Sequence, residues 1–130
     1  PYIDAFDIMW FVLFPNPPNV KKSQKSISMA RYPLSYSTEQ KAYVRIRSSW
    51  ELARMSSTAS LAYRGETRIK GTWRTTSLSG VGTISGVVES ALQGGIPIKH
   101  TGTLDRNFCY EEAKKQCQKQ SYSFQMEQIP

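Results

Sequence analysis

The sequence predicts an α+β protein, in which an antiparallel sheet of about five to seven strands carries one C-terminal helix packed on it. Three observations support this prediction. The middle of the chain alternates apolar and polar residues with period two, which is typical of half-buried strands. These strand patterns follow one another instead of alternating with helical patterns. The period changes only near the C-terminus, over residues 105–120.

The clearest strand covers residues 40–50, where Ala42, Val44, Ile46 and Trp50 share one face. The segment LAYRGETRIKGTWR, residues 61–74, places its large apolar residues at odd positions and all of its charged residues at even positions. It is either one long strand or two short ones, because its central Gly65 allows a turn or a bulge. Further strands are expected at residues 27–36, as an edge strand interrupted by Pro33, and at residues 79–90, 96–104 and 121–129. The expected core residues are Val44, Ile46, Leu61, Ile69, Trp73, Ile98 and Phe124.

The expected helix, residues 105–120, contains no Gly or Pro and has a favourable Glu111–Lys115 pair. It also contains the only two cysteines, Cys109 and Cys117. Within one helix their Cα atoms would lie about 12 Å apart, whereas a disulfide requires less than about 7 Å. Either the helix begins after Cys109 or the two thiols are not bonded. We predict the disulfide, because no other cysteine is present to pair with either thiol.

Three segments are expected along the chain. Residues 1–19 form an apolar N-terminal arm and a proline break, residues 20–26 form a basic linker, and residues 27–130 form the sheet-dominated domain. The apolar run IMWFVLF in the arm is too short to cross a bilayer, which requires about 20 residues. We therefore expect no transmembrane segment, and an arm that joins the sheet as an edge strand or is donated to a neighbouring subunit. The residues of this assembly arm are Met9, Trp10, Phe11, Leu13 and Phe14.

The charge balance indicates an anionic partner, because 17 Lys and Arg stand against 10 Asp and Glu, for a net charge of +7. Solubility alone would also explain such a charge. If the two best strands share a sheet, their outward residues form one basic face with one aromatic ring among them. The partner-binding residues expected there are Tyr43, Arg45, Arg47, Arg64, Arg68, Lys70 and Arg74.

These observations favour a non-catalytic, exported binding or assembly module that docks through the Arg-rich face or the N-terminal arm. A secreted or periplasmic location fits a disulfide and a chain that starts at Pro1. The expected partner is a protein or an acidic glycan, with nucleic acid or a second copy of the chain as further candidates. No cofactor or metal is expected, since the C-x7-C spacing matches no common zinc pattern and GVGTISG matches no phosphate-binding loop.

Two alternatives belong to other classes. A small basic secreted hydrolase or toxin could act on RNA with Glu89 as base, His100 as acid and Arg106 on the phosphate. His100 is the only histidine, and it shares a face with Ile98 and Leu104, which favours a partly buried, hydrogen-bonded side chain over a catalytic one. An intracellular RNA-binding domain is the other alternative. It is disfavoured because only Tyr43 is clearly outward, whereas RNA platforms use several exposed aromatic rings.

Overall fold

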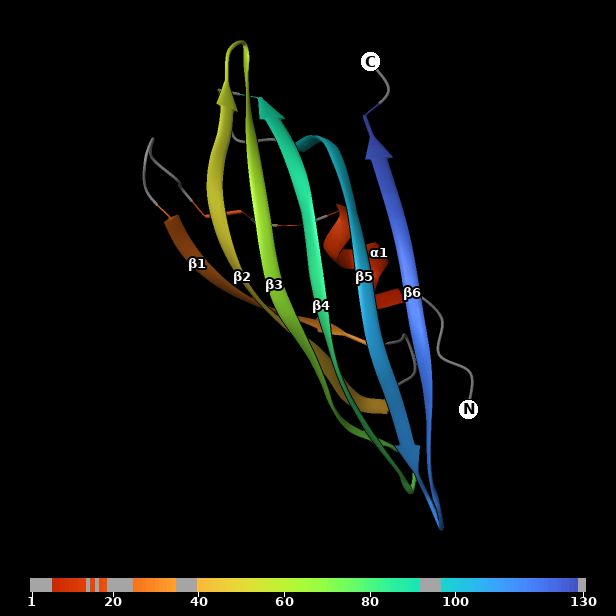
Figure 1. Cartoon of the computed structure of the whole chain (residues 1–130). Coiled ribbons are helices and arrows are strands. Elements are labelled where there is room, and N and C mark those ends of the chain that lie inside the picture. Colours follow the sequence, from red (N-terminus) through yellow and green to blue (C-terminus); the bar gives the residue numbers. More distant parts are fainter. Residues whose placement is uncertain are drawn as a thin grey trace.

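The protein is a single antiparallel sheet with a short helix on one face (Figure 1). The computed structural model describes residues 6–13, 15, 17–18, 25–34, 40–91 and 97–128. The six strands lie side by side in chain order, and each pairs antiparallel with the next. The elements are α1 (Phe6–Leu13), β1 (Lys25–Pro33), β2 (Gln40–Met55), β3 (Thr58–Trp73), β4 (Thr76–Ala91), β5 (Pro97–Glu111) and β6 (Lys115–Glu127). The first strand begins inside the expected basic linker, and residues 20–24 of that linker lie outside the described residues.

The alternation expected from the sequence is confirmed in the two central strands. Along β2 the even residues from 42 to 50 are buried and the odd ones are exposed. The segment around Gly65 is one continuous strand, β3, which pairs along its length with β4. Val44, Ile46, Leu61 and Ile69 are buried as predicted. Trp73, Ile98 and Phe124 are only half-buried, because the first two lie near strand ends and the third is on an edge strand.

The core lies on one side of the sheet, which we call the inner face. Trp50, Phe108, Leu104 and Val88 are fully buried there. The indole N–H of Trp50 donates to Ser28 Oγ at 2.8 Å and to Ser48 Oγ at 2.9 Å. Its polar atom is therefore satisfied inside the core, which removes the usual cost of burying an indole N–H.

Helix α1 covers the inner face and lies against both edge strands, β1 and β6. Its Phe11 is 1% exposed and makes edge-to-face contacts with Tyr32, Tyr63 and His100, at centroid distances of 5.8, 5.4 and 5.3 Å. The arm is therefore a helix in the described residues and not the expected edge strand. A one-sided sheet needs such a cover, because its apolar face would otherwise remain in water.

The predicted C-terminal helix is wrong, because residues 105–120 contribute to strands β5 and β6 and to the turn between them. A helix would have buried only a thin stripe of Cys109, Ala113 and Cys117. The observed hairpin buries Phe108 and Leu104 from β5 on the inner face. Helix propensities differ by only tenths of a kcal/mol per residue, so the larger apolar area that the hairpin buries decides the local structure.

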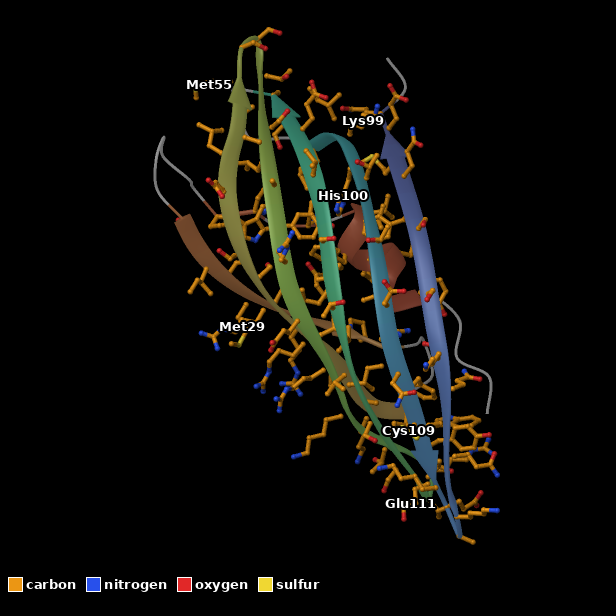
Figure 2. The ribbon with its side chains drawn as sticks, viewed as in Figure 1. Met29, Met55, Lys99, His100, Cys109 and Glu111 are labelled. Atoms are coloured by element: carbon orange, nitrogen blue, oxygen red, sulfur yellow. A yellow bond between two sulfur atoms is a disulfide. The ribbon has the colours of Figure 1, made fainter. Side chains whose placement is uncertain are left out.

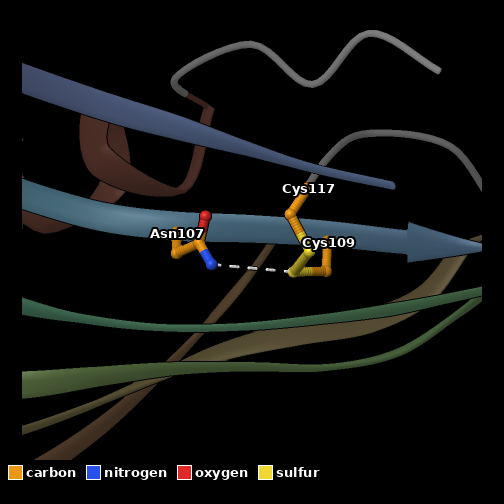
Figure 3. Close-up of a disulfide and its surroundings, with 3 residues drawn as sticks. All are labelled: Asn107, Cys109 and Cys117. Atoms are coloured by element: carbon orange, nitrogen blue, oxygen red, sulfur yellow. Dashed lines mark hydrogen bonds between the residues drawn. A yellow bond between two sulfur atoms is a disulfide. The ribbon is translucent and has the colours of Figure 1, made fainter. Parts of the chain in front are cut away.

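The hairpin also resolves the alternatives for the cysteines. Cys109 on β5 and Cys117 on β6 are register partners with Cα atoms 4.1 Å apart, and their sulfur atoms form the predicted disulfide (Figure 3). Asn107 Nδ2 donates to Cys109 Sγ at 3.9 Å. The bond forms because the chain reverses between the two residues, which a continuous helix would not allow.

We predict that Phe11→Ala destabilises the protein by about 3–5 kcal/mol, as expected for removing a buried aromatic ring. Urea unfolding followed by tryptophan fluorescence measures this change. Met9→Ala is the matched control on the same helix, because Met9 is 44% exposed and its loss should change the free energy of unfolding by less than about 0.5 kcal/mol. Equal effects of the two substitutions would mean that α1 does not belong to the core.

The Cys109→Ala, Cys117→Ala double variant should be less stable than the oxidised parent by about 2.5 kcal/mol, from the entropy of a loop with a sequence separation of 8. Guanidinium unfolding measures the difference. Under dithiothreitol the parent and the variant should converge, since neither then has the bond. A difference that persists unchanged under reducing conditions would assign the effect to packing instead.

Candidate functional site

The outer face of the sheet carries three arginines in one cross-strand row. Arg31 of β1 is the register partner of Arg45 of β2, and Arg45 is the partner of Arg68 of β3. Neighbouring strands lie about 4.8 Å apart, so the three side chains start within about 10 Å of one another. The sequence prediction missed Arg31. The alternation of Ile27, Met29 and Arg31 along residues 27–31 is the signal that would have found it.

Further cations surround this row. Arg47 on β2 and Arg64 and Lys70 on β3 were expected at this surface, and their side chains are exposed like those of the row. We call the whole set the basic face: Arg31, Arg45, Arg47, Arg64, Arg68 and Lys70. Glu66 is the exposed carboxylate among these cations, as the register partner of Arg47 between Arg64 and Arg68, whereas Arg31, Arg45 and Arg68 have one another as register partners. Like charges directly opposite one another are unfavourable in a sheet, and a bound anion would relieve that repulsion.

The predicted residues Tyr43 and Arg74 have different positions. Tyr43 lies at the border of the basic face and is 41% exposed, with the Arg31 guanidinium 4.2 Å from its ring centroid. One side of this ring is therefore already in contact with a cation. Arg74 lies in the turn after β3 with a φ of 55°, and its guanidinium is 5.5 Å from the ring centroid of Trp73. The structure brings the other predicted residues together and places Arg74 apart from them.

Exposed apolar side chains flank the basic face. Ile27 and Met29 on β1 are 65% and 60% exposed, and Val81 on β4 is 60% exposed. Figure 2 shows Met29 pointing away from the face that α1 covers. Val81 is the register partner of Arg68, and Met29 is the partner of Arg47. A shallow groove of about 680 Å³ runs over this face, with Ile27, Arg47, Arg64, Thr83 and Thr103 among its lining residues.

His100 lies on the opposite, inner face and is fully buried (Figure 2). Its Nδ1 is 3.1 Å from the Val12 carbonyl oxygen, and its Nε2 is 2.6 Å from the Tyr63 hydroxyl. A carbonyl can only accept, so Nδ1 carries the proton and Nε2 accepts from the hydroxyl. Burial lowers the pKa of His100 below its ordinary value, and the bond to Val12 opposes this shift. Burial likewise raises the pKa of Tyr63, so both groups are neutral at physiological pH.

Glycine makes the room for this arrangement. Tyr63 is the register partner of Gly86, and a Cβ atom at position 86 would lie only 2.6 Å from the Tyr63 hydroxyl and 2.9 Å from Cζ. The Tyr63 ring therefore lies over Gly86, and its hydroxyl reaches across β4 to His100 on β5.

The structure does not bring together the three residues of the hydrolase alternative. Glu89 is on the outer face of β4 and accepts a bond from Thr58 Oγ1 at 2.7 Å, whereas His100 is on the inner face. Arg106 shares the inner face but lies six residues along β5, about 20 Å from His100. Its Nε donates to Gln120 Oε1 at 2.7 Å. These side chains cannot meet on one substrate.

The assembly arm is divided between core and surface. Phe11 is buried, whereas Met9, Trp10 and Leu13 are 44%, 36% and 46% exposed; Phe14 lies outside the described residues. Between α1 and β6, a groove of about 470 Å³ has Met9, Val12, Leu13, Phe124 and Met126 among its lining residues. Donating the whole arm to a neighbour would remove Phe11 from its own core.

The described residues contain no cluster of three or more His, Cys, Asp or Glu side chains placed to hold a metal ion. Among the same residues, no helix has the length and apolar character needed to cross a membrane.

Acidification should destabilise the fold through His100. The unfolded chain binds a proton at histidine below its ordinary pKa of about 6.5, and the folded chain binds it only at lower pH because its pKa is lowered. The free energy of unfolding should therefore fall as the pH drops below about 6.5, by up to about 1.4 kcal/mol per pH unit. Urea unfolding between pH 7.5 and 5.5 measures this slope. Since His100 is the only histidine, His100→Gln should abolish it, and an unchanged slope in that variant would refute the assignment.

Comparison with known proteins adds no relative to this description. No family model matches the chain, and neither a curated protein nor a solved structure is significantly similar to it. The functional argument therefore rests on the geometry of the basic face.

Proposed function

We propose that this chain is a non-catalytic binding module that docks an acidic protein surface through its basic face. The observation that carries the proposal is the exposed row of Arg31, Arg45 and Arg68 in direct register on three adjacent strands. The strands hold the Cα atoms of these arginines at a fixed spacing, so binding has to order only the side chains and not the backbone that carries them.

The residue types favour carboxylates as the bound groups. Five of the six cations of the basic face are arginines, and the planar guanidinium binds a carboxylate or a phosphate through two parallel hydrogen bonds. Lysine is the weaker choice for such pairing because it acts as a point charge. The net charge of +7 also accelerates encounter with an acidic partner.

The neighbours of the arginines favour a protein over a nucleic acid or a glycan. Ile27, Met29 and Val81 present large apolar side chains beside the cations, and a mixture of Arg, Met and aromatic residues is typical of protein interfaces. Stacking of nucleic acid bases requires several free aromatic rings. Among the described residues, Tyr43 is the one exposed ring beside the basic face, and Arg31 already lies over it.

The buried state of His100 supports a non-catalytic role, since a general acid or base must reach a substrate. The Cys109–Cys117 disulfide supports a location outside the reducing cytosol, because disulfides persist in oxidising compartments. We therefore propose a secreted or periplasmic module.

A second candidate surface is the exposed apolar part of α1, which would serve association of two copies. Met9 and Leu13 are each more than two-fifths exposed and line the groove between α1 and β6. Association there leaves Phe11 in its own core. Sedimentation of the parent and of a Met9→Asp, Leu13→Asp variant tests this role. A dimeric parent and a monomeric variant would support it, and a monomeric parent would exclude it.

The Arg45→Glu, Arg68→Glu variant should bind an acidic protein probe at least about tenfold more weakly than the parent, a loss of about 1.4 kcal/mol or more. Titration with poly-L-glutamate at physiological salt measures the affinity. Lys115→Glu, Lys119→Glu is the control, because it makes the same change in net charge at two exposed outer-face positions of β6, and Lys119 lies three strands from Arg68. Equal losses of affinity in the two variants would mean that net charge, and not the position of the arginines, determines binding. Tighter binding of heparin or single-stranded RNA through the same arginines would replace the protein partner by a glycan or a nucleic acid.

A further inference from the structure

The first strand leaves one edge of the sheet without a partner among the described strands. The strand order makes β1 and β6 the two edge strands, and β1 pairs only with β2. An edge strand presents a row of unpaired N–H and C=O groups that another extended chain can bind. Most proteins protect such edges with charges or proline.

The register identifies which backbone groups point outward from β1. The Leu34 N–H donates to the Ala42 carbonyl oxygen at 3.3 Å, so the backbone groups of Leu34 point toward β2. Successive residues of a strand direct their backbone groups to alternate sides. The N–H and C=O groups of Ile27, Met29 and Arg31 therefore point away from β2, toward the open edge. Pro33 continues this series and has no N–H, which ends the set of donors.

The same three residues direct their side chains to the outer face. Ile27 and Met29 are 65% and 60% exposed, and Arg31 belongs to the basic face. An incoming strand bonded to these residues would place its own side chains beside two apolar groups and one guanidinium. The other edge strand is different, because the exposed outer-face residues of β6 include Lys115, Lys119 and Glu127, which are typical edge protection.

Charge excludes a second copy as the occupant and favours an acidic chain. Pairing two β1 strands about Met29 would bring two basic faces into one continuous sheet, with a net charge of +7 on each copy. Arg31, Arg45 and Arg68 already lie in one row, and a second basic face would add to their repulsion. A strand with a carboxylate opposite Arg31 would instead extend this row with the complementary charge.

We propose that the open edge of β1 binds an extended, acidic segment of the partner protein as an additional antiparallel strand. The segment reads acidic–x–apolar–x–apolar from its N-terminus, so that its carboxylate lies opposite Arg31 and its apolar residues lie opposite Met29 and Ile27. Backbone hydrogen bonds supply affinity in this mode of recognition, and alternate side chains supply specificity. This inference rests on the proposed function, because it describes how the acidic partner reaches the basic face.

The experiment uses the peptide Ac-Thr-Glu-Thr-Val-Thr-Val-Thr-NH2 as the probe and the reversed sequence as its control. Isothermal titration should show binding of the probe, and the reversed peptide should bind at least about tenfold more weakly because its glutamate would face Ile27. Met29→Pro removes one edge donor without touching the bonds to β2, so it should weaken probe binding at least about tenfold. Met29→Thr keeps that donor and should remain within about threefold of the parent.

Amide hydrogen exchange of the unmodified protein provides a second readout that does not depend on the folding of the proline variant. Saturating probe should slow exchange at Ile27, Met29 and Arg31 by at least about tenfold and leave the amides of β6 unchanged. Unchanged exchange at these three amides would overturn strand addition. If poly-L-glutamate binding still depends on Arg45 and Arg68 in that case, the proposed function survives; if that dependence is also absent, both proposals fail.

Discussion

The contact between α1 and the inner face is the constraint on which the other features depend. A single sheet buries only the face that something covers, and Phe11 fills the space between Tyr32, Tyr63 and His100. The same helix supplies the Val12 carbonyl oxygen that holds His100 in one tautomer. Burial under the helix keeps this histidine neutral and away from any substrate. The other face of the sheet is the one that remains exposed, and on β1, β2 and β3 it carries the arginines of the basic face.

Period-two alternation made the central strands predictable, because in β2 and β3 the apolar residues of the alternating pattern are the ones that are buried. The failure at residues 105–120 has a physical cause. Those residues have good helix propensity, and the two cysteines can be read on a helical stripe; but Leu104, Phe108 and the half-buried Tyr122 also fit alternating strands. Pairing across a hairpin is a non-local interaction that a local pattern does not reveal. The cysteines were the useful signal, since a bond between Cys109 and Cys117 is incompatible with one continuous helix.

The N-terminal arm and Arg31 show a second limit. An apolar run of seven residues fits a helix as well as a strand, and only the need to cover the inner face decides between them. Arg31 follows Ile27 and Met29 in phase, so its orientation could have been predicted from the sequence. Its importance could not, because the row with Arg45 and Arg68 depends on the register between β1 and β2. The predicted residues of β2 and β3 share one face because both segments alternate with period two.

The arrangement of charge opposes pairing of two copies at the edge of β1. On a neutral sheet, the exposed side chains of Ile27 and Met29 would favour pairing of this edge with the same edge of a second copy. Pairing of two copies at this edge would bring the arginine row beside a second basic face, and that repulsion opposes association through β1. A chain with carboxylates meets the opposite field at the same edge. Under the proposed function, attraction of an acidic partner and repulsion of a second copy at this edge would follow from one set of residues, and specificity would not require a preformed pocket.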